Sequence, residues 1–571
     1  MLLSDKERVI VHQSSITSTN IKEILVRRIP ILKWLPNYNW GKCLQDILAG
    51  FTVGLTVIPQ GIAYATVALL PPQYGLYSSF MGCFVYLVFG STKEVTVGPT
   101  AIMALLSQHH VKTLGEDIAV LISFLSGCII TAMGILQLGF LVDFISMPVI
   151  CGFSNAAAII IAASQLGTLL GISGKSDSFI DSISKIINHY NSITLWDTLL
   201  GVTTIILLVC LKVNFNLSTT FQKIMWLICL ARNAVVVIMG IVLVFALSLY
   251  DLKPFKITGN ITKGLPPFSP PPFSIDTSNK TYHFPELIQE LGSTIASIPL
   301  IAILESVAIA KAFAKGKTLD ATQEMFAVGL CNVIGSFVRS MPTTGSFTRT
   351  AVNNASGVKT PMGGIITGLL VLLACGLLTS IFQLIPKATL AAVIIVAMYY
   401  MFEVDIFSTL WRTKRIDLIP LIVTLICCLG LSLEYGMIVG IVINLIHLLY
   451  LAARPGLLIE ERVVDDMTVL FVLPKQSLSF PAAEYLREQV CHKCTESIPV
   501  IIDGRNVLRI DATVAKNLTL LHVDLETRQQ KLIFWNWSEE MKSILTNYDS
   551  SLSLSFKNCG SILQIFTNTV L

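Results

Sequence analysis

Hydrophobic side chains fill most of the chain between residues 47 and 452, in long runs that only short polar breaks interrupt. A helix needs about 20 apolar residues to cross the hydrocarbon core of a bilayer. On this basis we predict twelve spanning helices, at 47–69, 75–90, 118–139, 144–171, 194–212, 225–250, 286–310, 322–338, 362–384, 388–404, 417–432 and 436–452. Two further runs, at 97–107 and 346–356, are too short to cross, so the pattern predicts fourteen helical segments in all.

The composition agrees with this pattern, because 53% of the residues are hydrophobic and only 13% are charged. Soluble domains carry about 25% charged residues, so a chain of 571 residues with this balance needs lipid around it. A net charge of +4 gives a nucleic-acid partner no electrostatic support. The sequence shows no nucleophile–base pair, phosphate-binding loop or metal-ligand cluster. We therefore expect neither an enzyme nor a cofactor.

Basic residues near the ends of the predicted spans indicate which side of the membrane each loop occupies. Arg412, Lys414 and Arg415 lie in one short loop, Arg454 follows the last span, and the arm at 1–45 is also basic. With fourteen segments these stretches fall on one side, which the positive-inside rule makes cytoplasmic. We predict a multi-pass membrane protein with both termini in the cytoplasm.

The character of the chain changes after Pro455, where polar and apolar residues mix. The pattern predicts strands at 467–473, 499–503 and 531–535, and helices at 481–494 and 512–530. Strands that alternate with helices are typical of a small α/β domain. The sequence therefore predicts three parts: a cytoplasmic arm at 1–45, a membrane domain at 46–453, and a linker with a cytoplasmic α/β domain at 454–571.

The two short segments occupy corresponding places in the two halves of the membrane domain, and each opens on a break that contains glycine and proline. The residues that open them are Pro99, Thr100 and Ala101 in the first, and Ser346, Phe347, Thr348 and Arg349 in the second. Paired interrupted segments of this kind indicate the binding site of a transporter. Each half holds seven segments, an odd number, so the two halves are predicted to be inverted repeats.

A half-helix that begins inside the membrane directs unpaired N–H groups and the positive end of its dipole into the protein, and two such ends bind an anion. Pro99 suits the first helical turn, where its missing N–H costs nothing. Hydroxyls of Thr100, Ser346 and Thr348 can donate to anion oxygens. Arg349 adds a fixed positive charge. The alternative for Arg349 is a side chain that reaches the membrane interface or has a purely structural partner.

Glu305 lies deep in the eighth segment, where burial favours the neutral form of a carboxyl group. It is predicted to bind a coupling proton or to counter the charge of Arg349. The alternative is a glutamate that only forms a hydrogen bond to a neighbouring helix. Gln60 follows Pro59 in the first span and can donate an amide N–H to an anion. Interhelical hydrogen bonding by Gln60, and core packing by Tyr64, explain these two residues equally well.

At these residues the chain resembles the SulP family of sulfate and anion transporters. The matching stretches are LPPQYGLY at 70–77, GPTA at 98–101, ESVAIAKAF at 305–313 and TGSFTRTAVN at 344–353. Within the family the chain is most similar to the animal sodium-independent members. The resemblance implies a core and a gate domain, an elevator-like movement of the core, a cytoplasmic STAS domain at 465–571, and a homodimer.

The resemblance also implies substrates and site residues. The anion-site positions of the family correspond to Gln60, Tyr64, Thr100, Thr348 and Arg349, and the position of Glu305 is acidic in proton-coupled members. The implied substrate is sulfate, with chloride, oxalate or bicarbonate as further anions, moved by exchange or by proton symport in a plasma or lysosomal membrane. The alternatives are a chloride channel or fast uncoupled chloride transporter on the same scaffold, and a nucleobase or carboxylate carrier on the related fold.

Overall fold

The computed structural model describes residues 27–172, 179–211, 229, 231–252, 254–259, 264–277, 280–314, 319–464, 467–494 and 498–557. The chain divides into two compact units, of which the first ends at Ile441 and the second begins at Val442. The predicted division between residues 453 and 454 stays a prediction.

Each of the fourteen predicted segments overlaps a helix. The first half of the chain contains α2 (Ile31–Trp34), η1 (Leu35–Asn37), α3 (Trp40–Val67), α4 (Pro72–Phe89), α5 (Ala101–Leu114), α6 (Asp117–Ile135), η2 (Leu138–Phe144), α7 (Met147–Leu169), α8 (Phe179–Asn188), η3 (Tyr190–Ser192), α9 (Leu195–Cys210) and α11 (Arg232–Ser248). The second half contains α12 (Phe284–Leu291), α13 (Thr294–Phe313), α14 (Ala321–Ser336), α15 (Phe347–Ala355), α16 (Gly363–Leu373), the π-helical η4 (Ala374–Leu378), α17 (Thr379–Phe382), α18 (Lys387–Met401), α19 (Asp405–Thr413), η5 (Arg415–Asp417), α20 (Leu418–Gly430) and α21 (Leu433–Ala453). Within the described ranges, six helices are long and apolar enough to cross a membrane.

Two predicted boundaries are wrong. The run at 286–310 is not one helix, because α12 ends before Gly292, whose φ of 49° redirects the chain into α13. The segment at 97–107 begins as a strand, β1 (Val97–Gly98), and its helix starts only at Ala101. A two-residue strand has no period of its own, so hydrophobic patterning does not reveal it.

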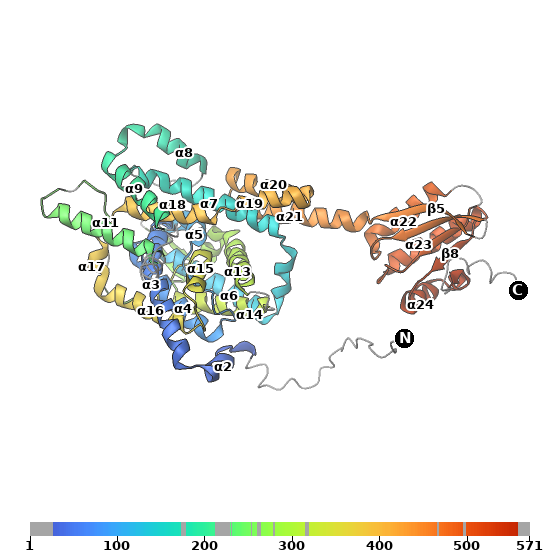
Figure 1. The fold of residues 1–571 in the computed structure, drawn as a ribbon, viewed down its shortest axis with the longest axis horizontal. Helices are drawn as coiled ribbons and strands as arrows, with labels where there is room; N and C mark the ends of the chain where they lie inside the picture. The colour runs from blue at the N-terminus through green and yellow to red at the C-terminus, as the bar shows by residue number, and fades with distance from the viewer. Residues whose placement is uncertain are drawn as a thin grey trace, which may run out of the picture. The chain divides into compact units, whose positions relative to one another are not determined.

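The helices of the first unit form two packed groups. The first group contains α3, α4, α6, α13, α14 and α16, and the second contains α7, α9, α11, α18 and α20. Figure 1 shows α7 and α18 on one side of this unit and α4, α14 and α16 on the other. Helices α5 and α15 contact both groups, since α5 packs on α3 and α7, and α15 packs on α3 and α18. This arrangement confirms the prediction of a core and a gate built from two repeats.

Helices α3 and α4 cross with their backbones in contact at Gly61 and Gly75. A Cβ atom on Gly75 would lie 1.9 Å from the carbonyl oxygen of Gly61, which no side chain tolerates. Pro59 lies two residues before this crossing and removes one N–H from the helical ladder. The contact fixes the part of α3 that carries Gln60 and Tyr64.

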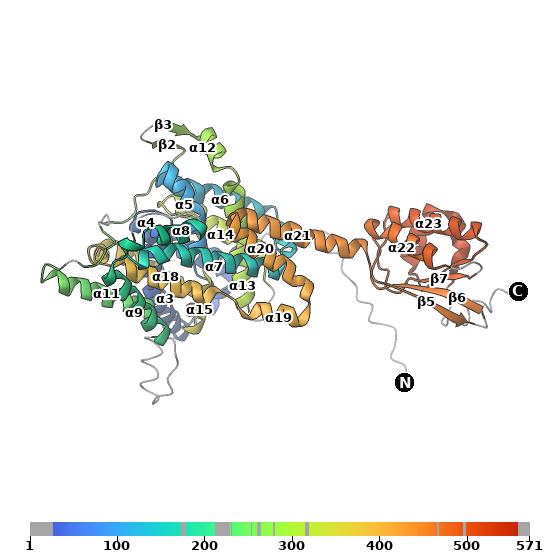
Figure 2. The same ribbon diagram turned by 90° about the horizontal axis from the view of Figure 1, so that it is seen from above.

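The helical unit also contains two small antiparallel sheets. In one, β1 pairs with β4 (Thr344–Gly345), so that Val97 lies opposite Gly345 and Gly98 opposite Thr344. In the other, β2 (Ser274–Thr277) and β3 (Lys280–His283) form a hairpin that leads into α12, as Figure 2 shows. The first sheet joins the two halves of the chain at the breaks that the sequence singled out.

The second unit is a five-stranded sheet with helices on one face. Its elements are β5 (Leu457–Val464), β6 (Met467–Pro474), α22 (Phe480–Lys493), β7 (Val500–Asp503), α23 (Ala512–Thr527), β8 (Leu532–Trp535), α24 (Glu539–Tyr548), η6 (Ser550–Ser555) and β9 (Phe556–Lys557). The strand order is β5-β6-β7-β8-β9, with β5 antiparallel to β6 and the remaining pairs parallel. Helices α22 and α23 cover one face (Figure 2). The predicted α/β domain is confirmed, although β5, α24 and β9 were not predicted.

Candidate functional site

The site is built around the antiparallel pair of β1 and β4. Beyond the pair, the backbone N–H of Ser346 donates to the carbonyl oxygen of Thr96 at 3.1 Å. The backbone N–H of Thr96 donates to the hydroxyl of Thr350 at 3.3 Å. Because the strands are antiparallel and each leads directly into a helix, the N-termini of α5 and α15 start from one shared element. The structure therefore brings together the two breaks, which lie about 250 residues apart in the chain.

Arg349 is the largest fully buried side chain at this junction, with 0% exposure. Its Nη1 donates to the carbonyl oxygen of Pro99 at 2.7 Å, across the strand pair. Its Nε and Nη2 have no hydrogen-bond partner among the residues that the structure describes. The alternative that Arg349 reaches the membrane interface is wrong, because the protein encloses the whole side chain.

A missing side chain makes room for this guanidinium. A Cβ atom placed on Gly98 would lie 3.2 Å from Nη2 of Arg349 and 3.5 Å from Cζ. The contact with Nη2 is tighter than ordinary van der Waals packing, so an alanine at position 98 would push against the charged group. Gly98 therefore allows Arg349 to approach β1 closely, and the sequence analysis did not select it.

The start of α5 differs from the prediction for Pro99. The N-cap of α5 is Thr100, whose hydroxyl accepts the N–H of Met103 at 3.4 Å. Pro99 therefore precedes the helix instead of occupying its first turn, and the prediction for Pro99 is wrong. What Pro99 contributes to the junction is its carbonyl oxygen, which holds Arg349. Ala101, also a predicted site residue, is the buried first residue of the helix.

Helix α15 begins without such a cap. Ser346 is its N-cap residue but makes no side-chain capping bond, and its Oγ lies instead 3.3 Å from Oγ1 of Thr348. The first N–H groups of α15 thus lack an oxygen from the N-cap side chain. The start of α15 presents backbone donors, two hydroxyls and the neighbouring Arg349, all of which favour a negatively charged ligand.

Glu305 lies on α13 and connects to the junction through Thr100. The hydroxyl of Thr100 donates to Oε2 of Glu305 at 3.4 Å. The Glu305 side chain is partly buried and lines a cavity of about 400 Å³. Phe347, which is 44% exposed, lines the same cavity. Glu305 and Arg349 interact electrostatically but form no direct hydrogen bond.

Gln60 and Tyr64 lie on α3, which packs against both α5 and α15. Both side chains are 3% exposed. The Oε1 atom of Gln60 has no hydrogen-bond partner in the described part of the chain, and Tyr64 interacts electrostatically with Arg349 and Glu305. The structure thus places both predicted residues in the region of the site.

The sequence analysis missed Ser306, the residue after Glu305. Its Oγ is buried and has no partner within the described residues, and it lies 3.3 Å from the place that a Cβ atom on Gly345 would occupy. A hydroxyl residue directly after an intramembrane acid was the available signal. Ser306 therefore adds a further donor beside β4.

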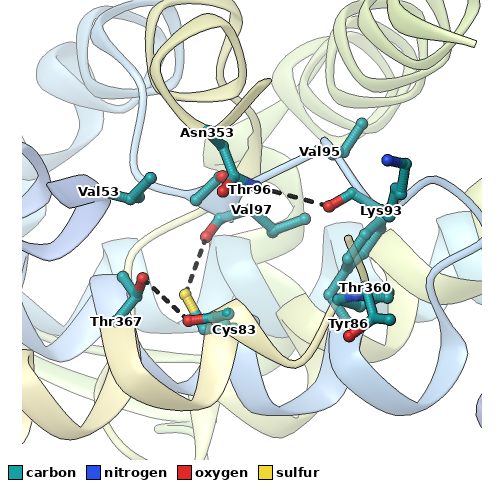
Figure 3. Close-up of a pocket in the computed structure, with 13 residues that line it drawn as sticks. Val53, Cys83, Tyr86, Lys93, Val95, Thr96, Val97, Asn353, Thr360 and Thr367 are labelled. Carbon is teal, nitrogen blue, oxygen red and sulfur yellow. Dashed lines mark hydrogen bonds between the residues drawn. The ribbon is translucent and has the colours of Figure 1, made fainter. Parts of the chain in front are cut away.

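Figure 3 shows a second, much smaller cavity beside β1, with a volume of about 20 Å³. Cys83, Thr96 and Asn353 are among its lining residues, and none of the predicted site residues is. The thiol of Cys83 donates to the carbonyl oxygen of Val97 at 3.8 Å, as the figure indicates. A space of this size holds about one water molecule, so it is too small for a polyatomic anion.

A multi-pass helical unit in which two broken helices meet at a shared strand pair defines a class of protein: a membrane transporter built from two repeats. Comparison with known proteins then gives the family. The model of the sulfate permease family matches residues 44–424, more than half of the chain. The chain therefore belongs to the sulfate permease family, whose members are anion transporters and not enzymes.

Two relatives illustrate the similarity in sequence. The sodium-independent sulfate anion transporter of Bos taurus is 42% identical over 523 residues, which cover 89% of this chain and 86% of that protein. The chloroplastic sulfate transporter 4.1 of Arabidopsis thaliana is 34% identical over 446 residues, which cover 76% of this chain and 62% of that protein. The predicted resemblance to the SulP family and to its sodium-independent animal members is confirmed.

Solved structures show the same fold. A structure of SLC26A9 matches with a TM-score of 0.83 at 20% sequence identity. The match covers 96% of this chain and 94% of the SLC26A9 chain. The murine Solute Carrier 26 family member A9 anion transporter in the inward-facing state has a TM-score of 0.80, with coverages of 94% and 92%. Both structures span the helical unit and the α/β unit, so the prediction of a STAS-type second domain is confirmed.

Proposed function

We propose that this protein carries sulfate and related small oxyanions across a membrane without sodium, and that the anion binds between Arg349 and the starts of α5 and α15. The observation that carries this proposal is the state of the Arg349 side chain. It is completely buried, one nitrogen is held by Pro99, and the other two have no partner in the described chain. A buried cation whose hydrogen-bond donors are only partly satisfied is costly, and a bound anion would satisfy the two remaining nitrogens.

The form of the donors favours an oxyanion over a halide. Guanidinium groups bind oxyanions through two parallel N–H···O bonds, which a spherical ion cannot reproduce. Hydroxyls of Ser346 and Thr348 lie at the start of α15, and Thr100 lies at the start of α5. A tetrahedral anion with four oxygens can accept from several of these donors together. The bovine relative named for sulfate supports the same substrate.

We propose that Glu305 couples anion binding to a proton. Its carboxyl group accepts a hydrogen bond from Thr100, and Glu305 lines the cavity of about 400 Å³. A charged carboxylate repels a dianion at Arg349, and a protonated one does not. Protonation of Glu305 therefore favours sulfate binding, which gives proton symport when both are released together. Exchange for another anion results when Glu305 keeps its proton state through the cycle.

The packing supports an elevator-like movement. The strand pair links α5 and α15, so the two half-helices move as one body with the core. The large cavity is lined by Glu305 of the core and by Cys151 and Tyr400 of the gate, so a sliding movement between the groups would open or close it. Lys311, in the last turn of α13, also lines this cavity, and a basic residue at the end of a span is typical of its cytoplasmic end. We take the structure to be open toward the cytoplasm.

The remaining predictions follow from the family and from the charge pattern. We propose cytoplasmic termini, a membrane domain at 46–453, a STAS domain within 454–571 and a homodimer in a plasma or lysosomal membrane. Chloride, oxalate and bicarbonate are further candidate substrates for the same site.

A flux experiment tests this proposal. Purified protein in proteoliposomes should take up radiolabelled sulfate faster at pH 5.5 than at pH 7.5, and oxalate should compete while uracil should not. Glu305→Gln, which fixes a neutral side chain, should transport at a rate that no longer depends on pH. Inhibition by uracil would point to a nucleobase carrier. A large chloride conductance without sulfate flux would point to a channel.

A further inference from the structure

Helix α14 carries a buried carboxylate that lies outside the anion site. The Glu324 side chain is 0% exposed. The phenolic O–H of Tyr86 donates to the two carboxylate oxygens of Glu324, at 3.0 and 2.9 Å, and the hydroxyl of Thr92 donates to Oε1 at 3.3 Å. Ser91 donates its backbone N–H at 3.2 Å and also forms a short hydrogen bond through its hydroxyl. Every one of these donors lies at the end of α4 or in the loop that leads into β1.

A buried amide lies eight residues later on the same helix. The Asn332 side chain is 1% exposed. Its Oδ1 accepts the N–H of Thr343 at 2.7 Å, and its Nδ2 donates to the carbonyl oxygen of Thr343 at 2.8 Å. Ser123 of α6 donates to the same Oδ1 at 3.3 Å. Asn332 thus binds both polar groups of the peptide backbone immediately before β4, as a neighbouring strand would.

Helix α14 therefore contacts the segments of chain that precede both strands of the pair. Eight helical residues span about 12 Å along the axis, roughly two turns. From this rigid element Glu324 fixes the chain before Val97, and Asn332 fixes the chain before Thr344. Asn353 of α15 also holds the chain before β1, since its amide donates to the carbonyl oxygen of Glu94 at 2.9 Å.

Stability alone does not account for this arrangement. A buried carboxylate costs several kcal/mol to desolvate, and well-packed apolar residues at such a position are often as stable or more so. What an apolar pair does not supply is direction, since a hydrogen bond requires a narrow range of distance and angle between its donor and acceptor. The polar groups of α14 therefore hold the two segments that lead into β1 and β4.

We propose that Glu324 and Asn332 are positioning residues for anion binding, which set the register of β1 against β4 and thereby aim the starts of α5 and α15 at one ligand. The inference rests on the proposed function, because it concerns the affinity of the proposed site. Neither residue touches the anion. Their effect passes through the Pro99 carbonyl oxygen, which holds Arg349, and through the uncapped start of α15.

The test uses full-length protein in proteoliposomes, with the KM for sulfate and the maximal rate measured separately. Glu324→Gln keeps the shape but turns one acceptor into a donor that faces other donors. Asn332→Asp places a carboxylate against the Thr343 carbonyl oxygen. Each should raise the KM about tenfold, because one buried pair is left unsatisfied. The matched control is Ile334→Val on the same helix, at a 37% exposed position, which should leave the KM unchanged.

Protein yield and thermal unfolding in detergent show whether each variant folds. If Glu324→Gln and Asn332→Asp do not fold, Ser91→Ala decides, since it removes one donor from an exposed loop residue and should raise the KM about threefold. A wild-type KM in folded Glu324→Gln and Asn332→Asp, or in Ser91→Ala when only that variant folds, would overturn the inference. Absence of saturable sulfate uptake by the wild-type protein would instead reject the proposed function, and the inference with it.

Discussion

Helix α15 of the membrane unit and helix α23 of the α/β unit begin in opposite ways. At α23 the side chain of Asp511 accepts the N–H of Val514 at 2.9 Å, and its second oxygen accepts the N–H of Phe480 at 2.6 Å. At α15 Ser346 provides no cap, and the nearby Arg349 keeps two nitrogens without a partner in the described chain. One helix end satisfies its donors internally, whereas the other leaves them available.

The comparison shows that two helix termini of one chain can differ in the donors that they leave available. Every helix has unpaired N–H groups at its start, and most chains satisfy them with a side-chain oxygen or with water. At α15 the N-cap residue Ser346 is buried but makes no capping bond, and a buried guanidinium lies beside it. In the proposed function, the anion is the negative partner that the described chain does not supply. The following predictions test both sides of this contrast.

The largest effect is expected from Arg349→Gln. The change removes the buried guanidinium charge at the junction, so sulfate uptake should fall by about a hundredfold or more, as the loss of two charge-assisted hydrogen bonds implies. The matched control is Arg339→Gln in the same unit. Arg339 already pairs with Asp117 at 3.0 Å, so this variant should keep most of its uptake. Equal losses in both variants would contradict a specific role for Arg349.

A smaller effect is expected from Gly98→Ala. The added Cβ atom would lie 3.2 Å from Nη2 of Arg349, which pushes the guanidinium away from β1 without removing its charge. The KM for sulfate should rise about three- to tenfold while the maximal rate changes little. Flux measured over a range of sulfate concentrations separates the two quantities. A lower maximal rate at an unchanged KM would mean that Gly98 serves movement and not binding.

The smallest effect on transport is expected from Asp511→Ala. Loss of this cap should lower the stability of the α/β unit by about 1 kcal/mol, and the KM for sulfate should stay at its wild-type value. Hydrogen exchange on the full-length protein should show faster exchange in the first turns of α22 and α23. Unchanged exchange there would mean that the cap contributes nothing to the unit.

The candidate site was predictable from the sequence where a single residue is energetically unfavourable in a membrane helix, as a charge or a helix break is. Charged Arg349 and Glu305 stand out in apolar runs, and the proline and glycine breaks beside Thr100 mark broken helices. Pro99 was wrongly predicted to lie in the first turn of the helix. The sequence does not reveal that Thr100 is the N-cap residue, which leaves Pro99 outside the helix.

Other residues could not be found because their roles depend on distant partners. Glu324 binds Ser91, which lies 233 residues earlier, and no local pattern links the two. In the sequence, Asn332 looks like any other polar residue in an apolar helix. Its role appears only in the structure, where it binds the backbone of Thr343. The fold was predicted more fully, since span length and periodicity are local properties. Among the elements that were missed are the two-residue strands, the break at Gly292, the hairpin of β2 and β3, and β5 and α24 of the α/β unit.

The central claim is that an oxyanion occupies the space beside Arg349, and a structure with bound selenate tests it most directly. Selenate has the shape and charge of sulfate and scatters X-rays anomalously near the selenium edge. The account predicts one anomalous selenium peak beside Arg349 at the start of α15, with a selenate oxygen within hydrogen-bond distance of Nε or Nη2, and this peak should disappear in Arg349→Gln. A peak elsewhere in the helical unit, with the space beside Arg349 empty at saturating selenate, would contradict it.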